Sequence, residues 1–273
     1  MQAWTTFFGR CLLAVCLVPG CQVLAAGIAP ALHCANGAAP QRIAGDGFQH
    51  GLAQWQIEQQ DPKGRVTAQD GVMEFEQPLG ATLWFRTPLR GDYEVRFQAT
   101  PLPINAGGFT QRVSDLNMFW NAQDSTVPDG NPTMTQRDAA LASYNPLRLY
   151  YVGFGANSNT STRLRRYDGS DARTQISGYA TPATASAEDR AGALTDATRL
   201  HAHKAVQVRI VSRKATAGDP TTLQWWANDT LVFAYADPQP YLKGWFALRT
   251  MTGRFQIRDF MVLGCTAAYS GNY

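Results

Sequence analysis

The most constraining feature of this sequence is a long succession of short runs in which apolar and polar residues alternate. Alternation puts apolar side chains on one face of a β-strand and polar side chains on the other. The clearest run places Tyr93, Val95 and Phe97 on one face. Glycines between the runs, such as Gly91 and Gly253, are typical of turns. The strand-like runs cover residues 72–76, 81–86, 92–98, 116–120, 149–154, 162–167, 206–211, 223–226, 231–235, 245–250 and 255–263.

These runs predict an all-β fold, because no stretch shows a convincing helical period. More than ten short strands in one chain favour a sandwich or jelly roll. The roughly 245 residues that follow the N-terminal segment fit one large β domain or two small ones, and we expect one, residues 27–273. Residues 123–136 and 168–198 are predicted to be loops, and the longer one, residues 168–198, either walls a groove or is a plain insertion.

The N-terminus has the features of a secretory signal peptide. Its first ten residues carry one positive charge, on Arg10, and residues 11–18 form an unbroken apolar run. A proline and a glycine break this run, and Ala26 ends a group of small residues that suits a signal peptidase. We therefore expect residues 1–26 to be removed and the protein to be secreted or periplasmic. Cys21 leaves open a lipoprotein anchored at the outer membrane, and no later apolar run is long enough to span a membrane.

Two cysteines remain beyond this region, Cys34 and Cys265, one near each end of the expected domain. In an oxidising compartment such a pair indicates a disulfide. In the chain-entropy model a bridge that closes so long a loop contributes up to about 5 kcal/mol. The terminal strands of a jelly roll can lie side by side, so the bridge would close the sandwich at its seam, away from a ligand groove.

The net charge argues against nucleic-acid binding, and the histidines do not form a recognisable metal motif. The chain carries 24 basic and 21 acidic residues, a net charge of +3, which is too mild for nucleic-acid binding by bulk charge. His201 and His203 alternate, but no third ligand has the spacing of a metal site. We expect a monomer without a cofactor, although calcium is common in jelly-roll sandwiches and its ligands cannot be identified here. His203 is a reserve candidate for a catalytic base.

Four local strings are more specific than the strand pattern. They are Ser-Asp-Leu-Asn-Met-Phe-Trp at 114–120, Tyr-Tyr-Val-Gly-Phe-Gly at 150–155, Asn-Ser-Asn-Thr-Ser-Thr-Arg-Leu-Arg-Arg-Tyr at 157–167 and Gly-Trp-Phe-Ala-Leu-Arg-Thr at 244–250. Together they resemble a poorly characterised bacterial family of concanavalin A-like jelly-roll proteins, over roughly residues 48–263. That family accompanies machinery for polysaccharides that contain uronic acids, including rhamnogalacturonan, and so implies a carbohydrate context. The chain departs from the family pattern at residues 252–254, where Thr-Gly-Arg stands in place of an expected Asn-His pair.

The most specific string would place reactive side chains on one strand face. In residues 162–167, alternation puts Arg163, Arg165 and Tyr167 together, and the preceding strand would present Tyr151 beside them. Arginine binds a uronate carboxylate bidentately, and neutralising that carboxylate makes the adjacent proton acidic enough for β-elimination. A tyrosine near arginines can have its pKa lowered toward the working range. We therefore predict two arginine neutralisers and a tyrosine base or acid; the alternative is an exposed arginine-rich strand with ordinary surface pairs.

Neighbouring strands would complete a groove suited to an acidic sugar chain. Asp115 and Asn117 share the polar face of one strand, and Trp245 and Arg249 share a face of another. Aromatic rings can stack on the apolar faces of pyranose rings. The predicted substrate-binding residues are Asp115, Asn117, Trp120, Asn157, Asn159, Trp245 and Arg249.

The sequence therefore favours a secreted polysaccharide lyase that cleaves a uronate-containing polymer by β-elimination. A glycoside hydrolase is one alternative, because Glu74 and Glu76 share a strand face and such enzymes use two carboxylates. A non-catalytic carbohydrate-binding protein is another, since one fold can host all three functions. The expected partner is an acidic polysaccharide, with no nucleic acid and no transmembrane segment.

Overall fold

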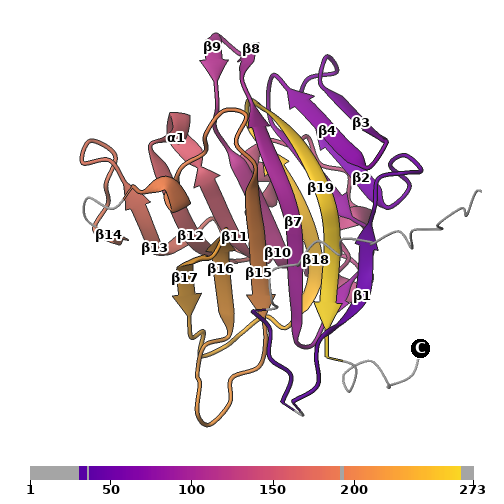
Figure 1. Ribbon diagram of the computed structural model, residues 1–273, viewed down its shortest axis with the longest axis vertical. Coiled ribbons are helices and arrows are strands. Elements are labelled where there is room, and N and C mark those ends of the chain that lie inside the picture. Colours follow the sequence, from indigo (N-terminus) through magenta and orange to yellow (C-terminus); the bar gives the residue numbers. More distant parts are fainter. Residues whose placement is uncertain (1–30, 36, 191–193, 266–273) are drawn as a thin grey trace, which may run out of the picture.

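The computed structural model describes residues 31–35, 37–190 and 194–265. Two large β-sheets, almost entirely antiparallel, are stacked on each other, with the eight-stranded sheet in front of the nine-stranded sheet in Figure 1. The predicted all-β sandwich is confirmed. The expected signal peptide, residues 1–26, and Cys21 lie outside the described residues. Among the residues described, no helix is long and apolar enough to cross a membrane.

The eight-stranded sheet contains the first and last strands of the fold. Its order is β17 (Thr230–Tyr235), β16 (Leu223–Ala227), β15 (Val206–Ser212), β7 (Tyr93–Leu102), β19 (Gly253–Gly264), β4 (Val72–Gln77) and β3 (Arg65–Gln69), with β1 (Gln41–Asp46) also paired to β19.

The nine-stranded sheet contains the strings that carried the family resemblance. Its order is β14 (Asp189–Arg190), β13 (Arg173–Ala180), β12 (Ser161–Asp168), β11 (Leu147–Gly155), β10 (Leu116–Asp124), β18 (Lys243–Thr250), β5 (Ala81–Phe85) and β2 (Trp55–Gln59), with β6 (Leu89–Arg90) paired to β18. The remaining elements are the hairpin of β8 (Ile104–Ala106) and β9 (Phe109–Arg112), the short turn α1 (Ala156–Asn159), and the 3-10 turns η1 (Pro128–Gly130), η2 (Pro132–Met134), η3 (Leu141–Tyr144) and η4 (Asp196–Thr198).

Each predicted strand-like run falls on a strand of one of these two sheets, and its apolar face packs between them. Tyr93, Val95 and Phe97 of β7 are fully buried in the core, as alternation predicts. The prediction that residues 168–198 form one long loop is wrong, because β13 pairs along β12 within it. This strand was missed because it is small and polar in sequence and lies near the edge of its sheet, where only its main chain needs partners.

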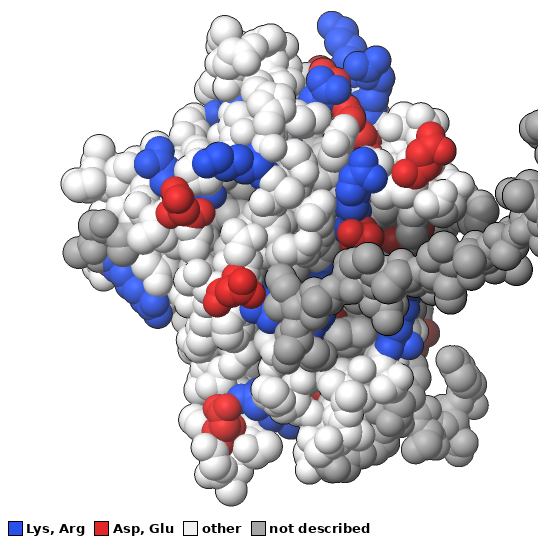
Figure 2. All heavy atoms as spheres, viewed as in Figure 1, with Lys and Arg blue, Asp and Glu red and all other residues white. Residues whose placement is uncertain are grey.

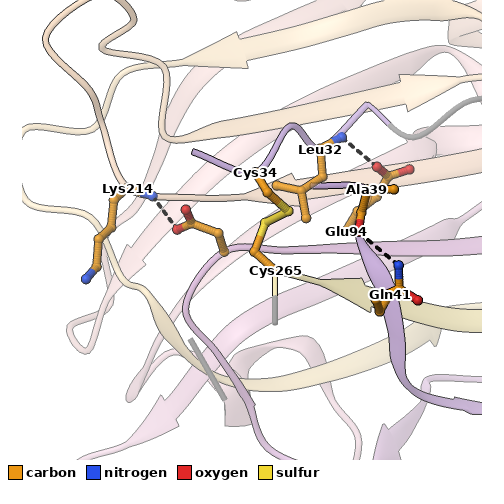
Figure 3. The surroundings of a disulfide bond; sticks show 8 residues. Leu32, Cys34, Ala39, Gln41, Glu94, Lys214 and Cys265 are labelled. Atoms are coloured by element: carbon orange, nitrogen blue, oxygen red, sulfur yellow. Dashed lines mark hydrogen bonds between the residues drawn. A yellow bond between two sulfur atoms is a disulfide. The ribbon is translucent and has the colours of Figure 1, made fainter. Parts of the chain in front are cut away.

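The predicted disulfide is confirmed and lies where the first and last described segments of the chain meet (Figure 3). The Sγ atoms of Cys34 and Cys265 are 2.04 Å apart, and the bridge spans a sequence separation of 231 residues. Strands β1 and β19 pair beside it, with Gln41 opposite Gly264. The segment before the bridge is fixed as well, since the backbone N–H of Leu32 donates to a buried carboxylate oxygen of Glu94 at 2.8 Å. The bridge therefore closes the seam of the sandwich.

Replacing both Cys34 and Cys265 with alanine should lower the free energy of unfolding by about 2–5 kcal/mol, because the unfolded chain regains the freedom of a very long loop. Urea denaturation measures this difference. Wild-type protein kept reduced throughout is the matched control and should behave like the double variant. A double variant as stable as the oxidised wild type would contradict the prediction.

Candidate functional site

The outer face of the nine-stranded sheet, turned away from the core, carries most of the predicted site residues. Strand pairing aligns two rows of side chains across this face. We call them the polar row and the aromatic row. The polar row is Thr82, Arg249, Asn117, Gly153 and Arg163, and the aromatic row is Trp84, Ala247, Phe119, Tyr151 and Arg165.

Arg249 is a fully buried cation at the centre of the polar row. Its Nη2 donates to the carbonyl oxygen of Ala139 at 3.1 Å and contacts the sulfur of Met251 at 3.2 Å, whereas its Nε and Nη1 have no hydrogen-bond partner. Within the described part of the chain, no carboxylate lies within ion-pair distance of this guanidinium. A buried charge without a counter-charge costs several kcal/mol, so this position suits an anionic ligand.

Asn117 lies directly opposite Arg249 in the strand pairing, and its side chain is also buried with unpaired polar atoms. Its side chain is 1% exposed, and neither the amide oxygen nor the amide nitrogen has a hydrogen-bond partner among the described residues. Buried amides are normally paired, because an unmade hydrogen bond costs about 1–3 kcal/mol. Two adjacent unsatisfied groups therefore mark one site for a polar ligand.

Tyr151 lies beside this pair and leans over Gly153. A Cβ atom at Gly153 would be only 2.7 Å from the Tyr151 hydroxyl, so the glycine makes room for this phenol. The space above this glycine is therefore filled by the protein's own tyrosine. The centroid of the Tyr151 ring lies 6.0 Å from that of the Tyr167 ring and 5.9 Å from the guanidinium carbon of Arg165. Arg165 is half-buried, with one long hydrogen bond of 3.5 Å to Gln175.

The expectation that nearby arginines lower a tyrosine pKa is wrong. Burial raises the pKa of Tyr151, and it outweighs the opposing effect of Arg249 and Arg165. Burial also raises the pKa of Tyr167, whose hydroxyl has no hydrogen-bond partner among the described residues. Both phenols are therefore protonated at neutral pH. We refer to Asn117, Tyr151, Arg165, Tyr167 and Arg249 together as the polar cluster.

Arg163 does not belong to this cluster, although it stands in the polar row. Its Nε and Nη2 bind the two carboxylate oxygens of Asp189 at 3.0 and 2.7 Å, and Nη2 also donates to the carbonyl of Thr184. Burial alone would raise the pKa of Asp189, but hydrogen bonds from Arg163, Ser186 and Gln175 lower it to about 2. Arg163 therefore anchors the loop between β13 and β14, and its guanidinium is not free to neutralise a substrate carboxylate.

Three other predicted contacts have structural roles instead. Trp120 is fully buried on the core side of β10, where its ring packs 5.7 Å from that of Tyr150, so its prediction as a substrate contact is wrong. Asp115 forms an ion pair of 2.5 Å with Arg112. Trp245 is 7% exposed, and its indole donates to the carbonyl of Arg86. Trp245 also lies four residues, about 13 Å, from Arg249 along β18.

The two asparagines of the Asn-Ser-Asn string also serve the backbone. Asn157 donates to the hydroxyl of Ser161 at 3.0 Å. Asn159 binds both backbone groups of Leu200, accepting from its N–H at 3.0 Å and donating to its carbonyl at 2.8 Å. These contacts make Asn159 a positioning residue for the segment around Leu200.

The residues considered for hydrolysis, metal binding and the reserve base lie elsewhere. Glu74 and Glu76 are on the outer face of the eight-stranded sheet, where Glu74 binds Arg254 at 2.6 Å and Glu76 binds Arg65 at 3.1 Å. Figure 2 shows that face, with charges of both signs scattered over it. The exposed His203 is held at the eight-stranded sheet by a backbone hydrogen bond to Pro101. No group of three or more metal-ligating side chains occurs in the part of the chain described.

A segment that includes most of the predicted loop at residues 123–136 covers the aromatic row. We call residues 125–146 the strap. Tyr144 of the strap packs on Phe119 and Trp84, with ring centroids 5.3 and 6.2 Å apart. The buried carboxylate of Glu58 holds it there by accepting from the Tyr144 hydroxyl at 2.7 Å, the Trp84 indole at 3.0 Å and the Arg137 backbone at 3.2 Å. Alternation within residues 81–86 was enough to place Trp84 on this face, but no signal pointed to Glu58.

The buried Glu58 predicts a pH-dependent stability. Burial raises its pKa above 4.5, against the lowering effect of its hydrogen bonds. In the unfolded chain this carboxyl ionises near its ordinary pKa of 4.5, whereas in the folded protein it ionises at a higher pH. The free energy of unfolding therefore falls as pH rises above 4.5, until Glu58 of the folded protein is ionised as well. The unfolding free energy of wild type minus that of Glu58→Gln should therefore fall over that range, as measured by urea denaturation at several pH values. Glu188→Gln, which removes an exposed carboxylate, controls for charge loss; a difference that is flat or rising in this range would contradict the prediction.

Solved structures confirm the concanavalin A-like jelly-roll sandwich. A protein of unknown function with a galectin-like fold from Bacillus subtilis is 14% identical, covering 82% of this chain and 97% of its own with a TM-score of 0.59. The endo-β-1,3-glucanase from Pyrococcus furiosus is 8% identical, covering 84% and 96% with a TM-score of 0.53. LamAcat from Zobellia galactanivorans is 11% identical, covering 82% and 98% with a TM-score of 0.50. At these identities the similarity shows the fold alone.

Sequence comparison gives a family but no activity. The family described as "Domain of unknown function (DUF6250)" matches residues 75–260 of this chain. No curated protein matches the chain. Neither the family description nor these structures names rhamnogalacturonan, so that association stays a prediction.

Proposed function

This chain belongs to the family described as a domain of unknown function, DUF6250, and we propose that it is an exported polysaccharide lyase acting on a uronate-containing polymer. The observation that carries this proposal is the buried guanidinium of Arg249, with two unpaired nitrogens, facing an unpaired Asn117. A protein retains a destabilising group of this kind where function requires it. A uronate carboxylate is the counter-charge that this position lacks.

In the proposed complex the uronate carboxylate binds one edge of the Arg249 guanidinium. Its two oxygens accept from Nε, which is free, and from Nη2, and the Asn117 amide donates a further hydrogen bond. Bidentate binding by arginine fixes both the distance and the plane of a carboxylate. It also withdraws charge from the carboxylate, which makes the neighbouring C5–H acidic. To reach this position, the carboxylate replaces the contact between Arg249 and the carbonyl of Ala139, a non-glycine residue at φ 60° in the strap.

Tyr151 is the proposed proton-transfer residue, because its hydroxyl projects over Gly153, next to Asn117. As phenolate it removes the C5 proton, and the electron pair forms the C4–C5 double bond while the C4–O4 bond breaks. The phenol then returns that proton to the departing O4. One residue therefore acts first as base and then as acid. Arg165, half-buried beside the Tyr151 ring, lies where a neighbouring acidic sugar would pass.

Two further findings support the proposal. The Cys34–Cys265 disulfide suits an exported protein. The sandwich is shared with an endo-β-1,3-glucanase, so the scaffold accommodates enzymes that cleave sugar polymers.

A panel of acidic polysaccharides tests the function directly. The protein is incubated with polygalacturonate, glucuronan and alginate, and both ultraviolet absorbance of unsaturated ends and total reducing ends are followed. If every new reducing end is matched by a new unsaturated end that absorbs in the ultraviolet, the lyase is supported. Reducing ends without absorbance would replace it by a hydrolase, and binding without new ends would replace it by a carbohydrate-binding module.

A further inference from the structure

We propose that the surface pocket between the β8–β9 hairpin and α1 is a second sugar subsite, which binds another anionic residue of the same polymer. This inference rests on the proposed function, because it assigns the pocket to the same substrate. Figure 1 shows the hairpin and α1 at the same end of the sandwich. The pocket has a volume of about 360 Å³, within the range of small-ligand sites. Its lining includes Phe109, Gln111, Arg112, Ser158, Asn159 and Arg199.

The pocket combines an exposed aromatic ring with an available cation. Phe109 is 43% exposed, and Arg112 covers its ring at 4.0 Å from the centroid. Arg112 is itself engaged, binding Asp115 at 2.5 Å and Ser158 at 2.6 Å. Arg199 is exposed and has no ion pair or hydrogen bond with the residues that the structure describes. The ring offers an apolar platform for a pyranose face, and Arg199 offers a partner for its carboxylate.

The backbone around the pocket is built to hold Arg199 in place. Gly155, Asn157, Ser158 and Asn159 all adopt left-handed φ values between 53° and 63°. Non-glycine residues adopt this conformation reluctantly, and asparagine tolerates it best. The resulting tight turn aims the Asn159 amide at both backbone groups of Leu200, the residue after Arg199. The specific Asn-Ser-Asn string therefore serves the pocket by fixing the position of its cation.

The segment that enters β10 links the pocket to the polar cluster. Asp115, which binds Arg112 of the pocket, lies close enough to Tyr151 to influence its electrostatics. Asn117 follows Asp115 by two residues, about 7 Å along an extended chain. A polymer bound with one uronate at Arg249 can therefore place a later residue against Phe109 and Arg199.

Affinity electrophoresis through gels that contain polygalacturonate, glucuronan or alginate tests the subsite without requiring cleavage. At least one polymer should retard wild type, and Arg199→Gln and Phe109→Ala should each weaken that retardation about tenfold in apparent affinity. Arg199→Lys should recover part of the loss. Lys214→Gln is the matched control, since it removes an exposed positive charge in the β15–β16 loop, near the disulfide (Figure 3). Wild-type migration unaffected by every polymer, or variants retarded as strongly as wild type, would overturn the subsite.

Kinetics on the cleaved polymer separates this inference from the proposed chemistry. Arg199→Gln should raise KM for the long polymer about tenfold and leave kcat, and the cleavage of chains too short to span both sites, unchanged. A matching loss on short chains would reject a distal subsite while leaving the lyase intact. Retardation that depends on Arg199 in a protein without cleavage would reject the lyase and keep the subsite.

Discussion

Arg249→Met should abolish cleavage of the uronate polymer, by at least about a thousandfold in kcat/KM, while leaving the fold as stable as wild type or more stable. Methionine is long, flexible and apolar, and can fill the space of a fully buried arginine. It removes a charge that has no carboxylate partner among the described residues, so the native bonding lost is limited to the contacts with Ala139 and Met251 and a cation–π contact with the Tyr144 ring, 5.6 Å from the guanidinium carbon. Replacing buried ionic groups with apolar side chains of similar volume is often neutral or stabilising.

The matched control for this prediction is Arg163→Met, three strands away in the same row. Arg163 is also buried, but its bidentate pairing with Asp189 means that its loss leaves a buried carboxylate without a counter-charge. Breaking such a pair costs about 3–5 kcal/mol. The two variants should therefore shift the melting temperature in opposite directions or by very different amounts. Full activity in Arg249→Met, or a destabilisation as large as that of Arg163→Met, would show that Arg249 is structural.

The contrast between these arginines marks the limit of what the sequence reveals. Alternation correctly placed Arg163, Arg165 and Arg249 on one face of the sheet, because a strand has only two faces. It does not show which guanidinium has an acidic partner. Asp189 belongs to a region that was expected to be loop, and its two hydrogen bonds to Arg163 depend on the path of the chain between β13 and β14. Which arginine pairs with a carboxylate is determined by the tertiary structure.

Other differences have equally specific causes. Alternation already groups Trp120 with the core residues Leu116 and Met118, so assigning it to substrate went against the strand pattern. The tyrosine pKa values were predicted in the wrong direction because the strap, which buries this face through Tyr144, has no strand or helix period. The fold was predictable because its core depends on local alternation, whereas the site depends on how one irregular segment covers a sheet.

Tyr151→Phe should reduce the rate of cleavage by about 10²–10⁴-fold, the usual contribution of a positioned acid or base. The change removes only a hydroxyl, and the ring keeps its packing against Phe119 and Tyr167. We therefore expect the melting temperature and the affinity for polymer to stay close to wild type. A variant that keeps more than a tenth of the wild-type rate would exclude Tyr151 as the proton-transfer residue.

The pH dependence of wild type gives an independent test of the same residue. Burial raises the pKa of Tyr151, so the phenolate needed as base is scarce at neutral pH and its fraction grows tenfold with each pH unit. The value of kcat/KM should rise by about that factor per unit through the neutral and mildly alkaline range. Tyr150→Phe is the control, because Tyr150 faces the core and binds Asp237, so its loss should alter stability and keep the slope. A rate independent of pH would assign proton abstraction to another group.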